Sequence, residues 1–248
     1  MEIVKEFSKF AYEYKKYNII QKEVAKKLIS ILEKKNYENI LDLGAGDGEV
    51  YKNLLNQNVN FEQFVALDFS SEMLKIHPES LNVTKICIDF NKKDSFSKFK
   101  NEKFNLLISS SALQWSENLN RVLSNISTLS DEYYFSFFTS NTFKTLHETV
   151  GISSPIYSKE KIIEALDILF IYEFEVKAYR LDFNSVHDML RYIKRSGVGG
   201  GVKQLSYSEM KRLMREYPLK YLEFEVIFVK AKSKLESNSS QQRKCYNE

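Results

Sequence analysis

A run of alternate glycines, between an apolar stretch and a helical pattern, most constrains how this chain folds. The apolar stretch is residues 40–43, the glycines are Gly44, Gly46 and Gly48, and apolar residues recur at helical spacing from Val50. A strand that breaks into glycines at its carboxyl end lets a nucleotide-like ligand lie against bare backbone. The order strand, glycine turn, helix predicts the first unit of an α/β fold.

The acid Asp42, two residues before the first glycine, indicates the charge of the ligand. A carboxylate at this place repels a pyrophosphate and attracts a cationic amino group. S-adenosylmethionine carries an ammonium and a sulfonium, so the sequence favours it over a dinucleotide.

A second predicted strand, residues 64–67, ends at Asp68, which lies 20 residues beyond Gly48. After one strand–helix–strand crossover, an acid at this distance meets a ribose diol. The residues after Asp68 are also typical of a helix that starts near residue 72, with Ser70 or Ser71 as the N-cap. The two interpretations are compatible.

The third predicted strand, residues 85–88, ends at Asp89 and Phe90. Asp89 can accept a hydrogen bond from an adenine amino group and Phe90 can pack on the ring. Asp89 is also a candidate turn residue, because a polar loop follows it, although the ligand-binding interpretation is favoured. Further strands are expected at residues 104–108, which end in three serines, and at 133–138.

Acids at the ends of three successive strands, with the glycine turn, resemble the class I S-adenosylmethionine-dependent methyltransferases. The resemblance implies a doubly wound, Rossmann-like sheet of seven mostly parallel strands, with an N-terminal helical lid and a helical insertion after the fifth strand. It implies that Asp42 and the glycine backbone hold the methionine moiety, Asp68 the ribose hydroxyls and Asp89 the adenine amine. The implied cofactor site comprises Asp42, Gly44, Ala45, Gly46, Gly48, Asp68, Phe69, Met73, Asp89, Phe90 and Ser110. Met73 also reads as a core residue of a helix.

Motifs along almost the whole chain resemble more narrowly the malonyl-acyl-carrier-protein O-methyltransferases of the biotin pathway. They are Phe10-Ala11-x-x-Tyr14 with Gln21, the strand exit 109–115, Leu146-His147, the segment 192–198 and the turn Tyr217-Pro218-Leu219-x-Tyr221. Ser110 stands where that family usually has Asn, so no Asn role is assigned to it. The strand exit is shared with trans-aconitate methyltransferases, which leaves a small free carboxylic acid as an alternative acceptor.

The narrower resemblance implies methylation of the free carboxylate of malonyl-acyl-carrier protein, giving a methyl ester for pimeloyl synthesis and S-adenosylhomocysteine. A carboxylate is ionised at neutral pH and needs no general base. Substrate positioning is therefore expected of four residues: Tyr14, Gln114, Trp115 and His147. Tyr14 and Trp115 are also candidates for core packing. His77 is expected in a surface loop, and His187 to pack or face solvent.

Residues 191–220 hold eight basic and two acidic residues, although the whole chain carries only +3. Such a segment suits an acidic or phosphate-bearing partner, or is a solvated helix face. With an acyl carrier protein as substrate, the docking residues are expected to be Arg191, Lys194, Arg195, Lys211, Arg212 and Arg215. Aromatic residues are not interleaved with these charges, which disfavours nucleic acid.

The 248 residues suit one domain, 1–232, with a polar tail at 233–248. Within it we expect a lid at 1–34, a cofactor half at 36–138 and a substrate- and partner-binding insertion at 139–220. The two cysteines suggest neither disulfide nor zinc, and Cys87 is expected to be a buried thiol. No metal is implied. The sequence shows no signal peptide or membrane-length apolar run, which predicts a cytoplasmic protein.

The sequence disfavours two other classes of function. A nicotinamide-dependent oxidoreductase is disfavoured by the acid before Gly44 and by the lack of a Tyr-x-x-x-Lys pair beside the fifth strand. A non-catalytic scaffold is disfavoured by the intact set of Asp42, Asp68 and Asp89.

Overall fold

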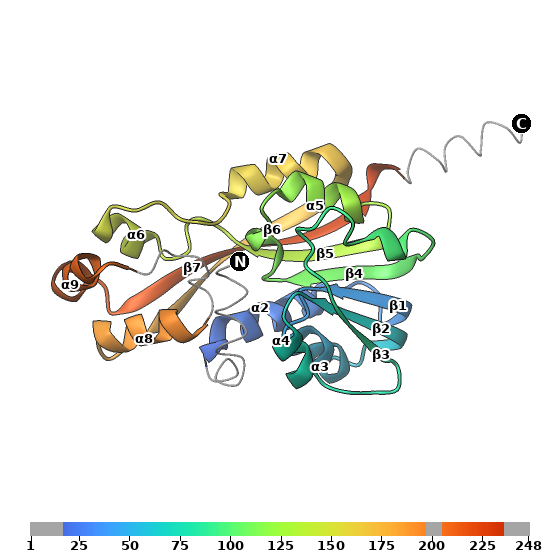
Figure 1. The fold of residues 1–248 in the computed structure, drawn as a ribbon, viewed down its shortest axis with the longest axis horizontal. Helices are drawn as coiled ribbons and strands as arrows, with labels where there is room; N and C mark the ends of the chain where they lie inside the picture. The colour runs from blue at the N-terminus through green and yellow to red at the C-terminus, as the bar shows by residue number, and fades with distance from the viewer. Residues whose placement is uncertain (1–16, 197–204, 236–248) are drawn as a thin grey trace, which may run out of the picture.

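The computed structural model describes residues 17–196 and 205–235, with the backbone only at 194–196, and shows a twisted sheet between helical layers (Figure 1). The strands are β1 (Asn36–Leu43), β2 (Asn60–Asp68), β3 (Val83–Cys87), β4 (Phe104–Ser110), β5 (Ser130–Phe138), β6 (Phe170–Asp182) and β7 (Tyr221–Ser233). Their order is β3-β2-β1-β4-β5-β7-β6, and β7 runs in the direction opposite to the other six strands. The expected doubly wound, seven-stranded, mostly parallel sheet is confirmed.

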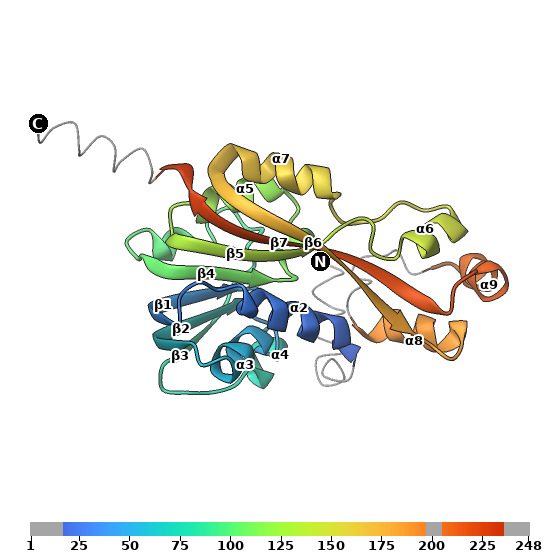
Figure 2. The same cartoon turned by 180° about the vertical axis from the view of Figure 1, so that it is seen from behind.

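Helices cover both faces of the sheet (Figure 2). They are α2 (Ile19–Ser30), α3 (Glu49–Asn56), α4 (Ser71–Ile76), α5 (Leu119–Ile126), α6 (Lys144–Val150), α7 (Lys159–Leu169), α8 (Val186–Ser196) and α9 (Tyr207–Glu216), with 3-10 turns η1 (Ser97–Phe99) and η2 (Leu113–Trp115). Along β1 the side chains alternate, so Ile40 packs with α2 and α3 while Leu41 packs with α5 and α7. Two apolar clusters result, one on each face. None of the helices in the described ranges is both long and apolar enough to cross a membrane.

Capping side chains determine where several helices begin. The Ser158 hydroxyl accepts a hydrogen bond from the Lys161 amide at the start of α7. At α9, Ser206 and Glu209 form a reciprocal capping box. Ser70 caps α4 through the Met73 amide, which confirms the N-cap interpretation of this segment.

The region after β5 contributes a strand to the sheet as well as helices. Residues 139–220 include β6, which pairs with β7 along its whole length and belongs to the sheet. Figure 1 shows these two long strands reaching beyond the rest of the sheet, with α6, α8 and α9 around their far end. Residues 1–16 of the expected lid and 236–248 of the tail lie outside the described residues.

Two expectations about single side chains were wrong. His77 is only 2% exposed, because its ring packs against Tyr51 and Phe64. Cys87 is exposed, because β3 is the edge strand of the sheet and Cys87 lies at its end. Local hydropathy shows neither which strand becomes an edge nor which loop side chain packs against distant aromatic rings. Neither placement could therefore be predicted from the sequence.

Candidate active site

The glycine turn lies where β1 ends and α3 begins. The amides of Gly44 and Ala45 donate to the Leu67 carbonyl at 2.7 and 3.0 Å, which ties the turn to the end of β2. Gly44 has φ +81°, and a Cβ there would lie 2.2 Å from the Cβ of Ala112, which follows β4. Glycine is therefore required by both the backbone conformation and this close approach.

Asp68 closes the turn from the β2 side. Its Oδ2 accepts a hydrogen bond from the Gly46 amide at 2.9 Å, and its Oδ1 accepts one from the Ser70 amide at 2.8 Å. Burial raises the pKa of Asp68 to about 6, although these backbone donors act in the opposite direction. A ligand that donates hydrogen bonds to this carboxylate would stabilise its charged form.

Asp42 lies behind the turn, within β1, and is fully buried. Neither carboxylate oxygen has a hydrogen-bond partner among the described residues. Burial, and then the nearby charge of Asp68, hold the pKa of Asp42 well above its usual range. A buried carboxyl without a partner is costly, so a positive charge brought close to it is favoured.

A cavity opens at the carboxyl ends of β1, β2 and β4 and encloses about 850 Å³ of empty space, part of it open to solvent. Its lining includes these predicted cofactor residues: Gly44, Ala45, Gly46, Asp68, Phe69, Met73, Phe90 and Ser110. An added Cβ at Gly46 would lie 3.6 Å from the Met73 Cε, which is an ordinary van der Waals contact.

The charged residues that line this cavity are all acidic: Asp47, Glu49 and Asp68. The Nζ of Lys52 lies 2.8 Å from Glu49 and 3.7 Å from Asp47. A cavity with this lining suits a cationic ligand better than a diphosphate. The residues present therefore fit S-adenosylmethionine.

Gln114 and Trp115 enter the same cavity from η2, after β4. The Gln114 Nε2 donates to the Ser111 carbonyl at 2.6 Å, while its Oε1 is buried without a partner. Ser111 has φ +58°, and this left-handed residue turns the chain so that η2 faces the glycine turn. Two of the four expected substrate-positioning residues thus lie beside the cofactor cavity.

Several predicted residues lie elsewhere. Asp42, Gly48 and Asp89 do not line the cavity. An added Cβ at Gly48 would meet Pro78 and His77 at 2.5 and 2.9 Å, so this glycine serves packing at the start of α3. The Asp89 Oδ1 accepts a hydrogen bond from the Asn91 amide at 2.9 Å, as a turn residue does.

His147 lies on α6 and lines a different cavity from Gln114 and Trp115. Tyr14 lies outside the described residues. Two residues that line the first cavity were not predicted individually: Asn18, which precedes α2, and Ala25, which lies within it. Asn18 is fully buried with Oδ1 unpartnered. No periodic signal distinguishes such a residue, because its role follows from how α2 packs over the turn.

Within residues 17–196 and 205–235, no group of three or more His, Cys, Asp or Glu side chains is arranged to hold a metal ion.

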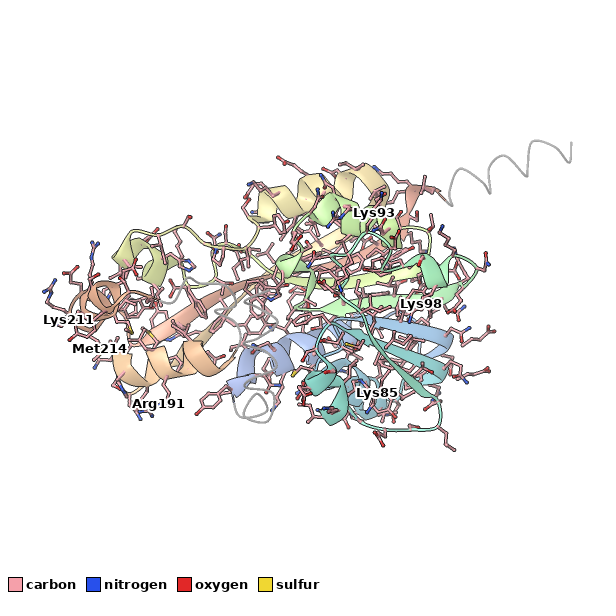
Figure 3. All side chains as sticks on the ribbon, in the orientation of Figure 1. Lys85, Lys93, Lys98, Arg191, Lys211 and Met214 are labelled. Carbon is pink, nitrogen blue, oxygen red and sulfur yellow. The ribbon has the colours of Figure 1, made fainter. Side chains whose placement is uncertain are left out.

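The predicted docking residues lie on α8 and α9. Figure 3 places Arg191 on α8 and Lys211 on α9 at the same end of the molecule. Arg191 pairs with Asp188 at 3.2 Å, and Arg212 and Arg215 both pair with Glu216, at 2.9 and 2.7 Å. The side chains of Lys194 and Arg195 lie outside the described part.

Sequence comparison relates the chain to methyltransferases. A family described as a methyltransferase domain matches residues 41–131, which include the glycine turn and the ends of β2 to β4. The malonyl-[acyl-carrier protein] O-methyltransferase of Bacillus cereus is 27% identical over 85% of each chain. That of Acetivibrio thermocellus is 27% identical over 94% of each chain.

Solved structures share the fold at low identity. The YcgJ protein of Bacillus subtilis matches with a TM-score of 0.60 at 11% identity, over 85% of this chain and 97% of that one. A methyltransferase of Thermotoga maritima matches with a TM-score of 0.53 at 12% identity, over 93% of this chain and 99% of that one. The cyclase SpnF matches with a TM-score of 0.54 at 11% identity, over 85% of this chain and 81% of that one. The fold alone therefore does not determine the reaction. Domain match, relatives and fold together support an S-adenosylmethionine-dependent methyltransferase with the class I fold, similar in sequence to the malonyl-[acyl-carrier protein] O-methyltransferases.

Proposed function

We propose that this enzyme methylates the free carboxylate of a malonyl group carried by an acyl carrier protein. The observation that carries the proposal is the extent of the sequence likeness. Relatives named for this reaction match over 85–94% of the chain, which includes the region after β5 as well as the cofactor half. The more general match to a methyltransferase domain covers only residues 41–131.

The cofactor site is assigned by the lining of the first cavity. Backbone at Gly44, Ala45 and Gly46 faces the methionine moiety, with the buried carboxyl of Asp42 behind it. Asp68 accepts hydrogen bonds from the ribose hydroxyls. Further assignments from the lining are Phe69, Met73 and Phe90 around the adenine and Ser110 beside the turn, with Gly48 as support for the turn. The family resemblance alone, and not the lining, proposes Asp89 for the adenine amino group.

When bound, S-adenosylmethionine supplies a methyl group that passes to the acceptor's carboxylate oxygen as its bond to sulfur breaks, leaving a neutral ester and a thioether. The acceptor is already ionised at neutral pH, so the chain needs to orient it and exclude water rather than remove a proton. We assign this orienting role to Gln114 and Trp115, and their position in the lining of the first cavity supports the assignment.

The carrier protein docks on α8 and α9 in this proposal. The α9 surface exposes Tyr207, Met210 and Met214 at 71%, 40% and 51%. The Lys211 ammonium lies 4.8 Å from the Tyr207 ring centroid and makes no ion pair among the described residues. An apolar surface among basic side chains suits an acidic protein partner, and Figure 3 places Lys211 and Met214 together there.

Substrate comparison tests the proposal. Reversing the charge at Lys211, Arg212 and Arg215 should lower kcat/KM for malonyl-carrier protein about tenfold or more. It should spare malonyl-pantetheine, which has no protein to dock. The matched control reverses the three exposed lysines Lys93, Lys98 and Lys100, and Figure 3 places Lys93 and Lys98 far from Lys211 on α9. Equal loss on both substrates would contradict the docking surface, and turnover of trans-aconitate but not of malonyl-carrier protein would favour the alternative acceptor.

A further inference from the structure

A second cavity lies beyond the carboxyl end of β5, between α6 and the start of α7. It encloses about 940 Å³ of empty space, part of it open to solvent. Its lining includes Lys144, His147, Ser154, Tyr157, Ser158 and Lys161. Nothing in the cofactor assignment uses these residues.

The second cavity adjoins the first. Phe138 at the end of β5 lines the first cavity, and Ser140, two residues later, lines the second. The Ser140 amide donates to the Tyr157 carbonyl at 2.9 Å. The Tyr157 hydroxyl donates to the carbonyl of Ser116 at 2.6 Å, directly after Trp115. The two cavities therefore share a wall made by the end of β5, Tyr157 and Ser116.

The second cavity favours an anion. Lys144 and Lys161 line it, and Lys161 makes no ion pair within the part of the chain that the structure describes. The one acid in the lining, Glu148, lies 3.9 Å from Lys144, and both side chains are more than half exposed, so the pair is weak. The cavity also meets the first turn of α7, an 11-residue helix, where amide donors and the helix dipole favour negative charge.

His147 supplies a second, independent indication of a ligand. The residue is 6% exposed, lines the cavity, and has no hydrogen-bond partner at either ring nitrogen. The buried Ser154 hydroxyl also lacks a partner. Buried polar groups are normally satisfied, so unpartnered donors beside two lysines indicate a missing acceptor.

We propose that the second cavity binds a phosphate-sized oxyanion through Lys144, Lys161 and His147. We further propose that during turnover this anion is the phosphate ester of the acceptor's carrier arm. The second statement rests on the proposed function, whereas the first stands on the cavity alone. A phosphate held here would place the arm along the shared wall, with its thioester end toward Trp115.

The first test uses inorganic phosphate and the protein without substrates. The chain has three histidines, so the imidazole resonances of His147, His77 and His187 can be assigned by NMR. The His147 signal should shift saturably with phosphate while the His77 signal stays, and Lys161→Ala should weaken the apparent affinity about fivefold to tenfold. Lys103→Ala, before the amino end of β4, is the matched control. An unmoved His147 signal, or equal affinities for the two variants, would overturn the anion site.

The second test compares malonyl-pantetheine with and without its 4′-phosphate. The enzyme should show a lower KM for the phosphorylated form by about tenfold, and Lys161→Ala should bring the ratio of the two KM values toward one. A ratio that Lys161→Ala leaves unchanged would show that the cavity binds only free anions, which overturns the assignment to the carrier arm. If neither thioester is methylated, the proposed function fails while the phosphate titration still decides the anion site.

Discussion

The buried carboxyl of Asp68 should make the affinity for S-adenosylhomocysteine depend on pH. Burial raises its pKa to about 6, despite hydrogen bonds from the Ser70 and Gly46 amides. If ribose hydroxyls donate to this carboxylate, the ligand binds the ionised form and returns the pKa toward its usual range. Binding must then release a proton wherever the free protein holds one.

The size of the effect follows from this pKa. Asp68 in the free protein is ionised to about one tenth at pH 5 and about nine tenths at pH 7. A ligand that needs the ionised form therefore binds about tenfold more tightly at pH 7, a difference of about 1.4 kcal/mol. Asp68→Asn should bind more weakly and lose this slope.

Titration calorimetry at pH 5, 6 and 7 measures the slope, and buffers of different ionisation enthalpy measure the proton release. Asp131→Asn, an exposed acid at the start of β5, is the matched control and should keep the wild-type slope. Equal slopes for wild type and Asp68→Asn would refute the assignment of Asp68 to the ribose.

Two further predictions concern stability. Gly44→Ala should unfold at a clearly lower temperature than Gly151→Ala and should lose stabilisation by S-adenosylhomocysteine. Both glycines have positive φ, so alanine at either position costs about 1 kcal/mol of backbone strain. Only at Gly44 would the added Cβ also clash, since it would lie 2.2 Å from the Cβ of Ala112. Equal melting temperatures would contradict the close approach. Burial lowers the pKa of His77 to about 4, below its value in the unfolded chain. Protonation at low pH therefore favours the unfolded chain, and the free energy of unfolding should fall by about 3 kcal/mol between pH 6.5 and pH 4. Urea unfolding of His77→Gln at pH 7 and pH 4.5 should show a smaller loss than wild type, and an unchanged loss would show that His77 is not the buried titrating group.

The cofactor half was predictable because its signals are local. The glycines, the acid at the end of β2 and the capping serine are each set by the backbone that they serve, and Gly44 and Asp68 lie where the sequence placed them. The seven-stranded, mostly parallel sheet follows from the family resemblance, and the structure confirms it.

The region after β5 was less predictable, because side-chain position there depends on packing between distant segments. His147 follows β5 in sequence, yet α6 packs beside α9 and places it in a separate cavity. Asp42 was expected to meet the ligand directly, whereas the glycine turn covers it. Neither hydropathy nor residue spacing reports whether a turn folds over the residue before it.

Carboxyl methylation is tested most directly by the chemical nature of the product. Incubation with methyl-labelled S-adenosylmethionine and malonyl-carrier protein should place the label on the carrier, and mild alkali should release it as methanol, because a methyl ester is base-labile. Label that resists alkali, or no transfer from a protein that binds S-adenosylhomocysteine, would contradict the account.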